Sequence, residues 1–501
     1  MPEFSVAEFG PFMQNVVPMR YPRFLPALIL LAIVCLFGPG LWSNLHADFM
    51  ARDPGPRGAP VGAGNPIAGL TDSQADFFED GLLRFGEINS VSGNLLGEVG
   101  VGLGPGFNSN SCASCHSQPT TGGSSPSTHA YPFVGPNPQV AVATLDGASN
   151  TVPFFITGDG PVREARFKYF LASTGSLSSE RDGGVHNVFT IQGRTDATNV
   201  PGLTGTRQSC EMAQPDFEQM QTLNNLSLRI PTPLFGDGFI ENISEATLTA
   251  NLESDGALKT ALGIRGHFNR NPNDGTISRF GWKAQNKSLQ LFSAEAESVE
   301  MGVSNEVFPN EHGYAPVQPP ASCLFNPTPE DHTEMEAGNA GPAVVSNAVE
   351  FANFMRFLAQ PRPSCSGAGC PQNVQNGRSL FNSTGCGLCH TPSLKTTVSY
   401  FSQQLSNADA NLFSDLAVHH MGSGLADNII QGTAGPDEFR TAPLWGLGQR
   451  VFFLHDGRTQ DLVQAIEQHA SPGSEANGAV NRYRQLSEPQ KQDLLDFLRS
   501  L

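Results

Sequence analysis

Two short segments combine cysteine and histidine at a spacing that can do redox chemistry. Residues 112–116 read Cys-Ala-Ser-Cys-His, and residues 386–390 read Cys-Gly-Leu-Cys-His. Two cysteines three positions apart on a helical turn face the same side, so each sulfur can bond one vinyl carbon of a haem, and the adjacent histidine then lies under the iron. The sequence therefore predicts two covalently bound haem c groups. The attachment residues are Cys112, Cys115, Cys386 and Cys389, and the proximal iron ligands are His116 and His390.

Two other chemistries use paired cysteines, and they stay open at this point. A structural zinc site would need further cysteine or histidine ligands at similar spacing. A redox dithiol of the thioredoxin kind would not need a histidine directly after both pairs. Haem attachment explains both cysteines and the histidine of each motif, and it is the interpretation that we adopt.

The second axial face of each iron decides between electron transfer and catalysis. For the second haem the best candidate is His469, which follows the amphipathic stretch 462–466, and a surface histidine is the alternative. Two histidine ligands would close that iron to small molecules, so the haem would store or pass electrons. For the first haem, His129 and His186 are only weak candidates, because neither lies on a clear helix. We therefore expect the first iron to be open.

An open ferric haem with a proximal histidine can bind peroxide, provided that a nearby acid/base group moves the proton between its oxygens. Glu164 is the candidate for this role, although the same carboxylate could simply pair with a neighbouring arginine. An oxidisable indole could relay electrons between the haems. We assign this role to Trp282 rather than Trp445, with an ordinary core position as the alternative.

Composition limits the partners. With 501 residues the chain is long enough for two or three domains of about 100–200 residues. The net charge of −18 and the lack of Lys/Arg clusters argue against nucleic acid, so a basic protein or a small molecule fits better. The chain has 34 Phe but 6 Tyr, so many rings can pack on a porphyrin without adding polar groups, although most are ordinary core residues.

The N-terminus has the layout of a secretory signal. The apolar run 25–37 follows Arg20 and Arg23, and it is shorter than the roughly 20 residues of a transmembrane helix. We predict a signal peptide over residues 1–47, with translation starting at Met19, and export to the periplasm. A retained membrane anchor is the alternative.

Four cysteines lie outside the leader and the two motifs. They are Cys210, Cys323, Cys365 and Cys370. Because four is an even number of cysteines and the predicted compartment is oxidising, two disulfides are expected. Cys365 and Cys370 are close enough to close a small loop, which makes Cys210 with Cys323 the natural second pair, while other pairings remain open.

The elements that must position these residues are mostly helical. Residues 48–70 are rich in Pro, Gly and Ala and predict a flexible linker. Apolar periodicity predicts helices over 71–88 before the first motif, over 345–358, over 377–381 before the second motif, and over 488–501. About 270 residues separate the motifs, with many Gly and Pro and few periodic runs, so long loops are expected there.

Several segments resemble one bacterial family. They are 103–108, 279–284, 420–427 and 439–444 running on to 454–457. With the two haem motifs they are similar to the di-haem cytochrome c peroxidase superfamily, which includes the MauG maturation enzymes and the di-haem rubber oxygenases. Within it, the chain resembles the di-haem oxidoreductase branch, also known as thiol oxidoreductases, over nearly all of the sequence after Thr71.

The resemblance implies a mainly α fold with two cytochrome-c-like haem domains, long irregular loops and little β structure. The N-terminal haem domain would span residues 71–343, enlarged by loop insertions, and the C-terminal one residues 344–501. Ca²⁺ between the domains is common in the family, although no local loop here has a convincing ligand pattern. His469 stands where typical peroxidases of the superfamily have methionine, which implies a lower potential at the second haem.

These observations predict a periplasmic di-haem oxidoreductase of the peroxidase type. Electrons from a small redox protein or another donor would enter at the C-terminal haem, cross by way of Trp282, and reduce hydrogen peroxide at the N-terminal haem. Dioxygen activation at the same open iron, as in the rubber oxygenases, is the rival enzymatic reading. A plain electron carrier with two six-coordinate irons is the third.

Overall fold

A computed structural model of the chain describes residues 50–58, 60–93, 98, 102–126, 135–172, 174–197, 212–312, 319, 323–324, 327–334 and 341–501. The predicted signal peptide, His129 and Cys210 lie outside the described residues. All described residues from Ala51 to Leu501 belong to one structural unit. Within this described part, no helix has both the length and the apolar character needed to span a bilayer.

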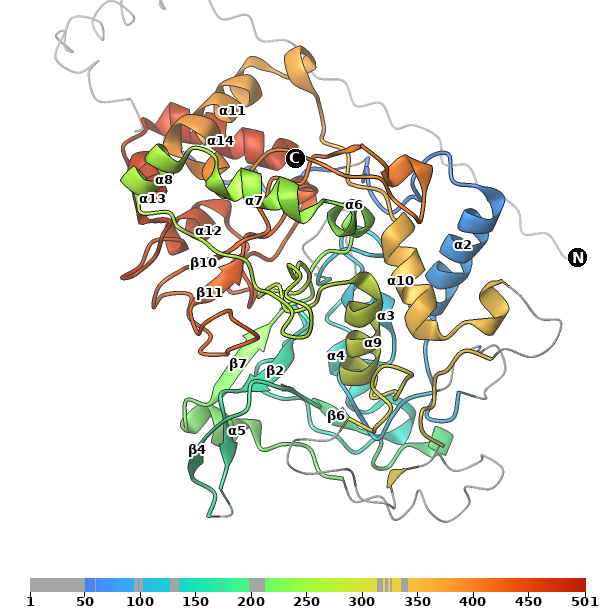
Figure 1. Cartoon of the computed structure of the whole chain (residues 1–501). Helices are drawn as coiled ribbons and strands as arrows, with labels where there is room; N and C mark the ends of the chain where they lie inside the picture. Colours follow the sequence, from blue (N-terminus) through green and yellow to red (C-terminus); the bar gives the residue numbers. More distant parts are fainter. Residues whose placement is uncertain are drawn as a thin grey trace, which may run out of the picture. The chain divides into compact units, whose positions relative to one another are not determined.

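Two pairs of packed helices flank the two motifs (Figure 1). In the first pair, α2 (Asp72–Gly86) packs against α10 (Asn347–Phe357). Helix α2 begins near Thr71, as the sequence predicts, with a capping box in which Thr71 and Gln74 satisfy each other's backbone N–H. Its buried Phe85 lies 4.8 Å, centroid to centroid, from Phe354 of α10, in an apolar core that reaches the first motif. Helix α10 comes after residue 343, the predicted end of the N-terminal haem domain. It nevertheless packs on α2, which lies within that predicted domain.

The second pair consists of α11 (Gln372–Thr384), which leads into the second motif, and the C-terminal α14 (Glu488–Ser500). Their buried faces form a second apolar core that includes Phe381. The helices touch at Gly377, where a β-carbon would lie 1.9 Å from the carbonyl oxygen of Asp493. Glycine is therefore what allows these two backbones to approach.

We expect Gly377→Ala to destabilise the protein by about 1–3 kcal/mol, because the added methyl group overlaps the α14 backbone. This outweighs the helix preference of alanine over glycine, about 1 kcal/mol. Gly256→Ala is the matched control, since a β-carbon at Gly256 meets nothing within 4 Å. A urea unfolding midpoint that falls for Gly377→Ala and holds or rises for Gly256→Ala is the expected result. Equal midpoints for the two variants would contradict this packing.

The remaining helices are shorter. They are α3 (Cys112–Cys115), α4 (Gln139–Val142), α5 (Phe217–Thr222), α6 (Asp237–Glu241), α7 (Glu245–Glu253), α8 (Gly256–Leu262), α9 (Leu289–Glu300), α12 (Leu462–Gln468) and α13 (Asn477–Arg484). The first motif thus forms a single helical turn, α3. In the second motif, Cys386–Leu388 form a 3₁₀ turn after α11.

The strands are two to five residues long and pair antiparallel. They are β1 (Gly106–Phe107), β2 (Glu164–Phe167), β3 (Tyr169–Leu171), β4 (Leu177–Arg181), β5 (Val185–His186), β6 (Phe189–Thr190), β7 (Leu226–Arg229), β8 (Leu394–Lys395), β9 (Asp409–Ala410), β10 (Val418–His420) and β11 (Glu438–Arg440). Strand β2 lies between β5 and β7, and the other pairs are β1 with β6, β3 with β4, β8 with β9, and β10 with β11. The expectation of a mainly α fold with little β structure is confirmed at the level of class, while the two haem domains stay a prediction.

The expected linker, residues 48–70, is not a free tether from Ala51 onward. Asp53 forms a 2.6 Å ion pair with Arg499 of α14. The Arg57 N–H donates to the carbonyl oxygen of Gly448 at 2.7 Å, and Ile67 is buried in the first core. The composition suggested flexibility, but these charged and apolar side chains have fixed partners far along the chain.

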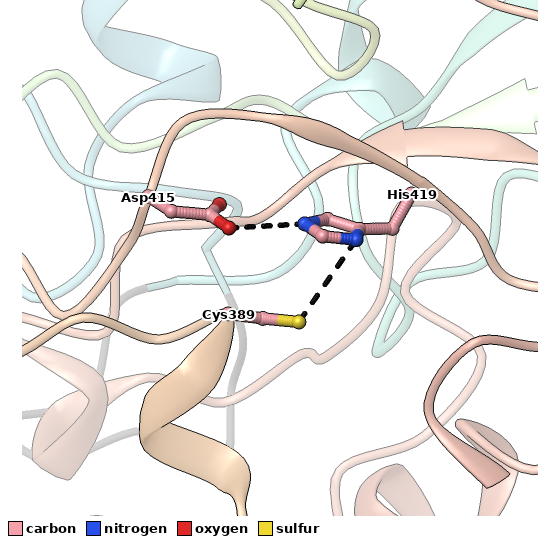
Figure 2. Close-up of side chains that lie close together, drawn as sticks. All are labelled: Cys389, Asp415 and His419. Carbon is pink, nitrogen blue, oxygen red and sulfur yellow. Dashed lines mark hydrogen bonds and ion pairs between the residues drawn. The ribbon is translucent and has the colours of Figure 1, made fainter. Parts of the chain in front are cut away.

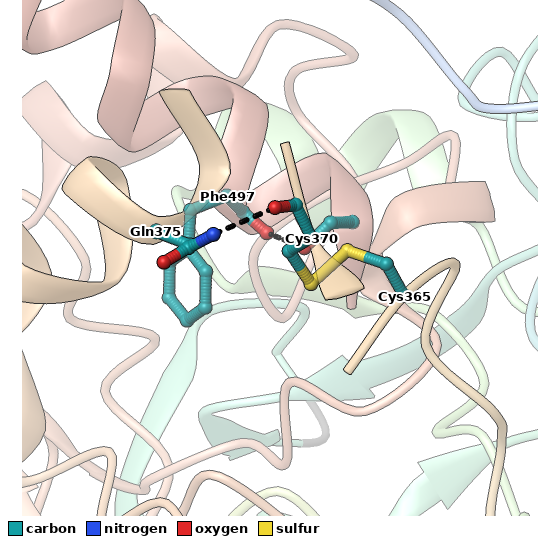
Figure 3. The surroundings of a disulfide bond; sticks show 5 residues. Cys365, Cys370, Gln375 and Phe497 are labelled. Atoms are coloured by element: carbon teal, nitrogen blue, oxygen red, sulfur yellow. Dashed lines mark hydrogen bonds between the residues drawn. A yellow bond between two sulfur atoms is a disulfide. The ribbon is translucent and has the colours of Figure 1, made fainter. Parts of the chain in front are cut away.

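Cys365 and Cys370 form a disulfide with an S–S distance of 2.11 Å (Figure 3). The Gln375 side-chain amide, at the start of α11, donates to the carbonyl oxygen of Cys370 at 2.7 Å. Cys323 is also disulfide-bonded, and its predicted partner Cys210 lies outside the described residues.

Candidate functional site

The second motif opens onto an apolar cavity that it shares with His469. The cavity lining includes Cys386, Cys389, His390, His469, Phe381, Phe453 and Leu494. His390 donates its Nδ1–H to the carbonyl oxygen of Phe413 at 3.0 Å. His469, which follows α12, donates its Nδ1–H to the carbonyl oxygen of Ala465 at 2.7 Å. In both rings Nε2 is therefore the nitrogen with the free lone pair.

Both imidazoles are held in the neutral form. Burial, and then the neighbouring His469, lower the pKa of His390 to about 4. Burial also lowers the pKa of His469. A neutral imidazole whose Nδ1–H is fixed by a backbone carbonyl is the form that ligates a metal through Nε2. The two rings can therefore serve as paired ligands at one iron.

Two arginines in the same cavity were not predicted from the sequence. Arg440, on β11, and Arg450 are buried, and burial lowers the pKa of each to about 10. Arg440 Nε and Arg450 Nη2 have no hydrogen-bond partner among the described residues. Buried guanidinium N–H groups without acceptors are costly, and carboxylates satisfy them best. The two propionates of a haem are such acceptors, so these residues fit a haem at the second motif.

The first motif opens onto a second cavity of similar construction. Its lining includes Cys112, Cys115, His116, Phe85, Leu234, Phe351 and Met355. His116 donates its Nδ1–H to the carbonyl oxygen of Gly123 at 3.0 Å, and burial lowers its pKa to about 4. The Phe85 ring lies 5.8 Å from its imidazole, as Phe381 lies 6.4 Å from His390 at the second motif. The paired cysteines, the neutral histidine and the apolar walls fit a haem here as well.

Glu164 lines the first cavity, and it also forms the arginine pair that was its alternative reading. Its Oε1 accepts from Arg166 Nε at 2.6 Å, and strand pairing places it directly opposite Arg229. Burial acts to raise the pKa of Glu164, but the Arg166 and Arg229 charges outweigh burial and hold it below its usual range. Glu164 is therefore a fixed carboxylate.

Glu300, the last residue of α9, lines the same cavity and was missed from the sequence. Burial, and then the charge of Glu164, hold the pKa of Glu300 well above its usual range. Asn108 Nδ2 donates to Glu300 Oε2 at 2.9 Å. The cavity therefore contains the Glu164 carboxylate beside Glu300, whose raised pKa lets it hold a proton. Glu297, in the same lining, also has a pKa well above its usual range, chiefly because of burial.

Two methionines also line the first cavity. Met301 directly follows α9, and its Sδ lies 3.7 Å from Cys112 Sγ. Met355 comes from α10. Neither methionine was predicted as an iron ligand, because both are more than 180 positions from the first motif in the sequence.

Trp282 lines both cavities. Its Nε1–H donates to the carbonyl oxygen of Ile230 at 2.8 Å, and the Arg450 guanidinium carbon lies 5.9 Å from the ring centroid. With 8% of its surface exposed, the indole is fixed between the two motifs. Trp445 is buried in the first core and is absent from both linings.

His186 and His455 differ in whether they line a motif cavity. His186 pairs with Asp182 at 2.8 Å, stacks on Phe167 with centroids 3.8 Å apart, and lines neither cavity. His455 lines the second cavity and stacks on Phe439 with centroids 4.3 Å apart.

Cys389 lies beside a buried charged group, shown in Figure 2. His419 Nε2 lies 3.0 Å from Asp415 Oδ2, and its Nδ1 lies 4.0 Å from Cys389 Sγ. Glu475 Oε2 contacts the same Nδ1 at 2.8 Å. Although burial opposes the charge, Cys389 and Asp415 hold the pKa of His419 well above its usual range. Cys389, Asp415 and His419 are close enough to hold a metal, which is the zinc alternative, but Cys389 belongs to the haem-type motif.

Two cavities that each combine paired cysteines with a neutral histidine define a haem-binding redox protein of mainly α fold. The sequence matches the family model described as "Di-haem oxidoreductase, putative peroxidase" over residues 186–501. The chain therefore belongs to the di-haem oxidoreductase family, and the predicted family is confirmed. The matched part contains the second motif, Trp282 and His469, whereas the first motif precedes it. None of the curated proteins matches the sequence.

Two solved structures show limited likeness. One is a MauG-like protein associated with microbial copper homeostasis, with 14% identity and a TM-score of 0.27, covering 52% of this chain and 89% of that one. The other is hydrazine synthase from Kuenenia stuttgartiensis, with 18% identity and a TM-score of 0.21, covering 32% of this chain. The match spans 56% of the hydrazine synthase chain.

Proposed function

We propose that this protein is a periplasmic di-haem c-type oxidoreductase of the peroxidase type. Electrons from a small redox protein enter at the second motif, and hydrogen peroxide is reduced at the first. When bound, the two haems supply the one-electron chemistry of this reaction. The observation that carries the proposal is the position of Trp282, whose indole lines both cavities.

At the second motif, the proposed ligands are His390 and His469. Each is neutral and oriented by a backbone carbonyl, so the pair would hold the iron and close it to exogenous molecules. Arg440 and Arg450 line the same cavity with N–H groups that lack acceptors among the described residues, so they would hold the propionates. This environment suits electron uptake and not peroxide binding.

At the first motif, His116 is the proposed proximal ligand. Reduction of peroxide to two waters consumes two protons as well as two electrons, so a proton source is needed there. Glu300 holds a proton in the cavity, and Glu164, fixed by Arg166, keeps that proton on Glu300. The acid/base role that the sequence suggested for Glu164 is therefore assigned to Glu164 and Glu300 together.

The location and the covalent link are parts of the same proposal. The Cys365–Cys370 disulfide favours an oxidising compartment such as the periplasm, where haem c is attached. Attachment would use the four motif cysteines. Ca²⁺ between the two motif regions, which the family resemblance implies, stays a prediction that calcium analysis of the purified protein would test.

The proposal is tested by rapid mixing of the ferric and half-reduced protein with hydrogen peroxide, following the Soret band and oxidation of a reduced donor. We expect a fast spectral change with donor turnover in the half-reduced protein. In Trp282→Phe, which retains an aromatic ring, turnover should fall by at least about tenfold, equal to ~1.4 kcal/mol in the barrier. Unchanged turnover in Trp282→Phe would refute the relay, and no response of the wild-type protein would refute peroxidase function.

A non-catalytic electron carrier is the second candidate, because Met301 and Met355 line the first cavity. A thioether on the free face would close the first iron. In that case both haems would be low-spin and would not respond to peroxide.

A further inference from the structure

A pair of buried carboxyl groups lies at one wall of the first cavity, where α9 meets the segment that precedes α10. Glu297 of α9 lines this cavity three residues before Glu300, so the two side chains share one face of the helix. Glu297 is 2% exposed, and its neighbour Asp331 is 4% exposed. In contrast to Glu164, which is paired with an arginine, Glu297 has other carboxyl groups as its charged neighbours, Asp331 first and then Glu330.

Asp331 is the better anion of the pair. The N–H groups of Asn347 and Ala348, the first two residues of α10, donate to its two carboxyl oxygens at 2.9 and 3.1 Å. The N-terminal end of a helix favours the ionised form of a carboxyl group. These two bonds oppose burial, which raises the pKa of Asp331. In the pair, Asp331 is therefore the group that accepts a hydrogen bond.

Glu297 is the group that donates. Its Oε2 accepts from Asn305 Nδ2 at 3.1 Å, whereas its Oε1 accepts from no N–H or O–H group of the described residues. The side chains of Glu297 and Asp331 nevertheless form a hydrogen bond, and a hydrogen bond between two carboxyl groups needs a proton. Burial, and then the charge of Asp331, hold the pKa of Glu297 well above its usual range. The proton therefore lies on Glu297, the member of the pair that lines the cavity.

The pair also has a carboxylate neighbour at the surface. Glu306 is exposed, and its Oε1 accepts the N–H of Thr333, two residues after Asp331. The charge of Glu306 acts on Asp331. An exposed carboxylate near a buried one gives protons from solution a place to bind on their way inward. Asp331 can therefore receive a proton from outside without its passing through the first cavity.

We propose that Glu297 is a second proton donor for peroxide reduction and that Asp331 returns the proton to it. This inference rests on the peroxidase function proposed above. Reduction of one peroxide to two waters takes two electrons from the donor and two protons, of which Glu300 supplies one. Glu297 gives the other proton to a peroxide oxygen and is left as a carboxylate. A proton from solution then passes by way of Asp331 and restores the acid form of Glu297.

The first measurement is the infrared absorption of the purified haem-loaded protein at neutral pH, in H₂O and in D₂O. A protonated carboxyl group gives a C=O band apart from that of carboxylates, and the band shifts in D₂O. Wild type should have one such band that Glu297→Gln lacks. In Asp331→Asn the band should remain but move, because the acceptor of the Glu297 proton has changed. This readout needs no peroxide, and equal bands in wild type and Glu297→Gln would overturn the proposal.

The second measurement is donor oxidation at saturating peroxide. Turnover should fall about 10²–10⁴-fold in Glu297→Gln, which keeps the size of the side chain but has no acidic proton, and it should also fall in Asp331→Asn. Glu311→Gln is the matched control, because Glu311 is buried, has a pKa raised to about 8 and lines neither motif cavity.

Glu311→Gln should stay within about twofold of wild type, as expected away from the chemistry. An active wild type with unchanged turnover in Glu297→Gln, or an equal loss in Glu311→Gln, would overturn the role of Glu297. A wild-type protein without turnover would instead refute the peroxidase function itself.

Discussion

Replacing Glu300 by glutamine should lower peroxide turnover by about 10²–10⁴-fold, the range that a positioned acid/base group contributes. Burial and the charge of Glu164 raise the pKa of Glu300 to about 8, so it carries a proton at neutral pH. Glu297 also lines the first cavity with a raised pKa, but its neighbours are Asp331 and Asn305, whereas Glu300 is the one coupled to Glu164. Glutamine keeps the size and the contact with Asn108 but cannot give up a proton. Steady-state donor oxidation at saturating peroxide is the measurement.

The matched control is Glu350→Gln. Glu350 also has a raised pKa, about 8, because of burial and the nearby Asp80, but it lies on α10 and lines neither cavity. Its replacement should leave turnover within about twofold of wild type, as expected for a site away from the chemistry. A comparable loss in both variants would indicate that Glu300 acts through stability and not through its proton.

Glu164→Gln adds a pH signature. Turnover that needs protonated Glu300 falls as pH rises through the Glu300 pKa. Removing the Glu164 charge removes one cause of the high pKa, so the fall should move to lower pH in Glu164→Gln. A profile that does not move would show that the two carboxyl groups are not coupled.

Replacing His469 by methionine should raise the midpoint potential of one haem by on the order of 0.1 V, within the ~0.8 V span that axial ligands control. Imidazole stabilises ferric iron relative to a thioether, and His469 faces the same cavity as His390 with its Nε2 available. Spectroelectrochemical titration of the purified protein measures the change.

His455→Gln is the control for this variant, because His455 is another histidine in the lining of the second cavity. It stacks on Phe439, and its replacement should leave the low-spin bands of the second haem in place. If the bands shift in His455→Gln and persist in His469→Met, the ligand assignment is wrong.

The local features of this fold could be read from the sequence. The two motifs, the start of the first helix near Thr71 and the C-terminal helix depend on residues close together in the chain, and the structure has them at the predicted positions. His469 was also accessible, because the amphipathic stretch before it forms α12 and sets its direction. Each of these predictions used a short-range pattern.

The missed residues depend on long-range packing. Glu300 is about 180 residues from the first motif, and nothing in its local sequence marks it as a cavity residue. Arg440 and Arg450 are recognisable only because their buried N–H groups face the second cavity without acceptors among the described residues. The linker was mistaken for a tether because Pro and Gly content does not reveal that Asp53 meets Arg499.

We propose that the two motifs hold two covalent haems with different coordination, one closed by His390 and His469 and one open to ligand. Intact mass spectrometry combined with low-temperature electron paramagnetic resonance of the ferric protein tests it most directly. We expect a mass equal to the processed chain plus two haems, with one low-spin bis-histidine signal and one high-spin signal. A mass with fewer than two haems, or two low-spin signals that persist when peroxide is added, would contradict it.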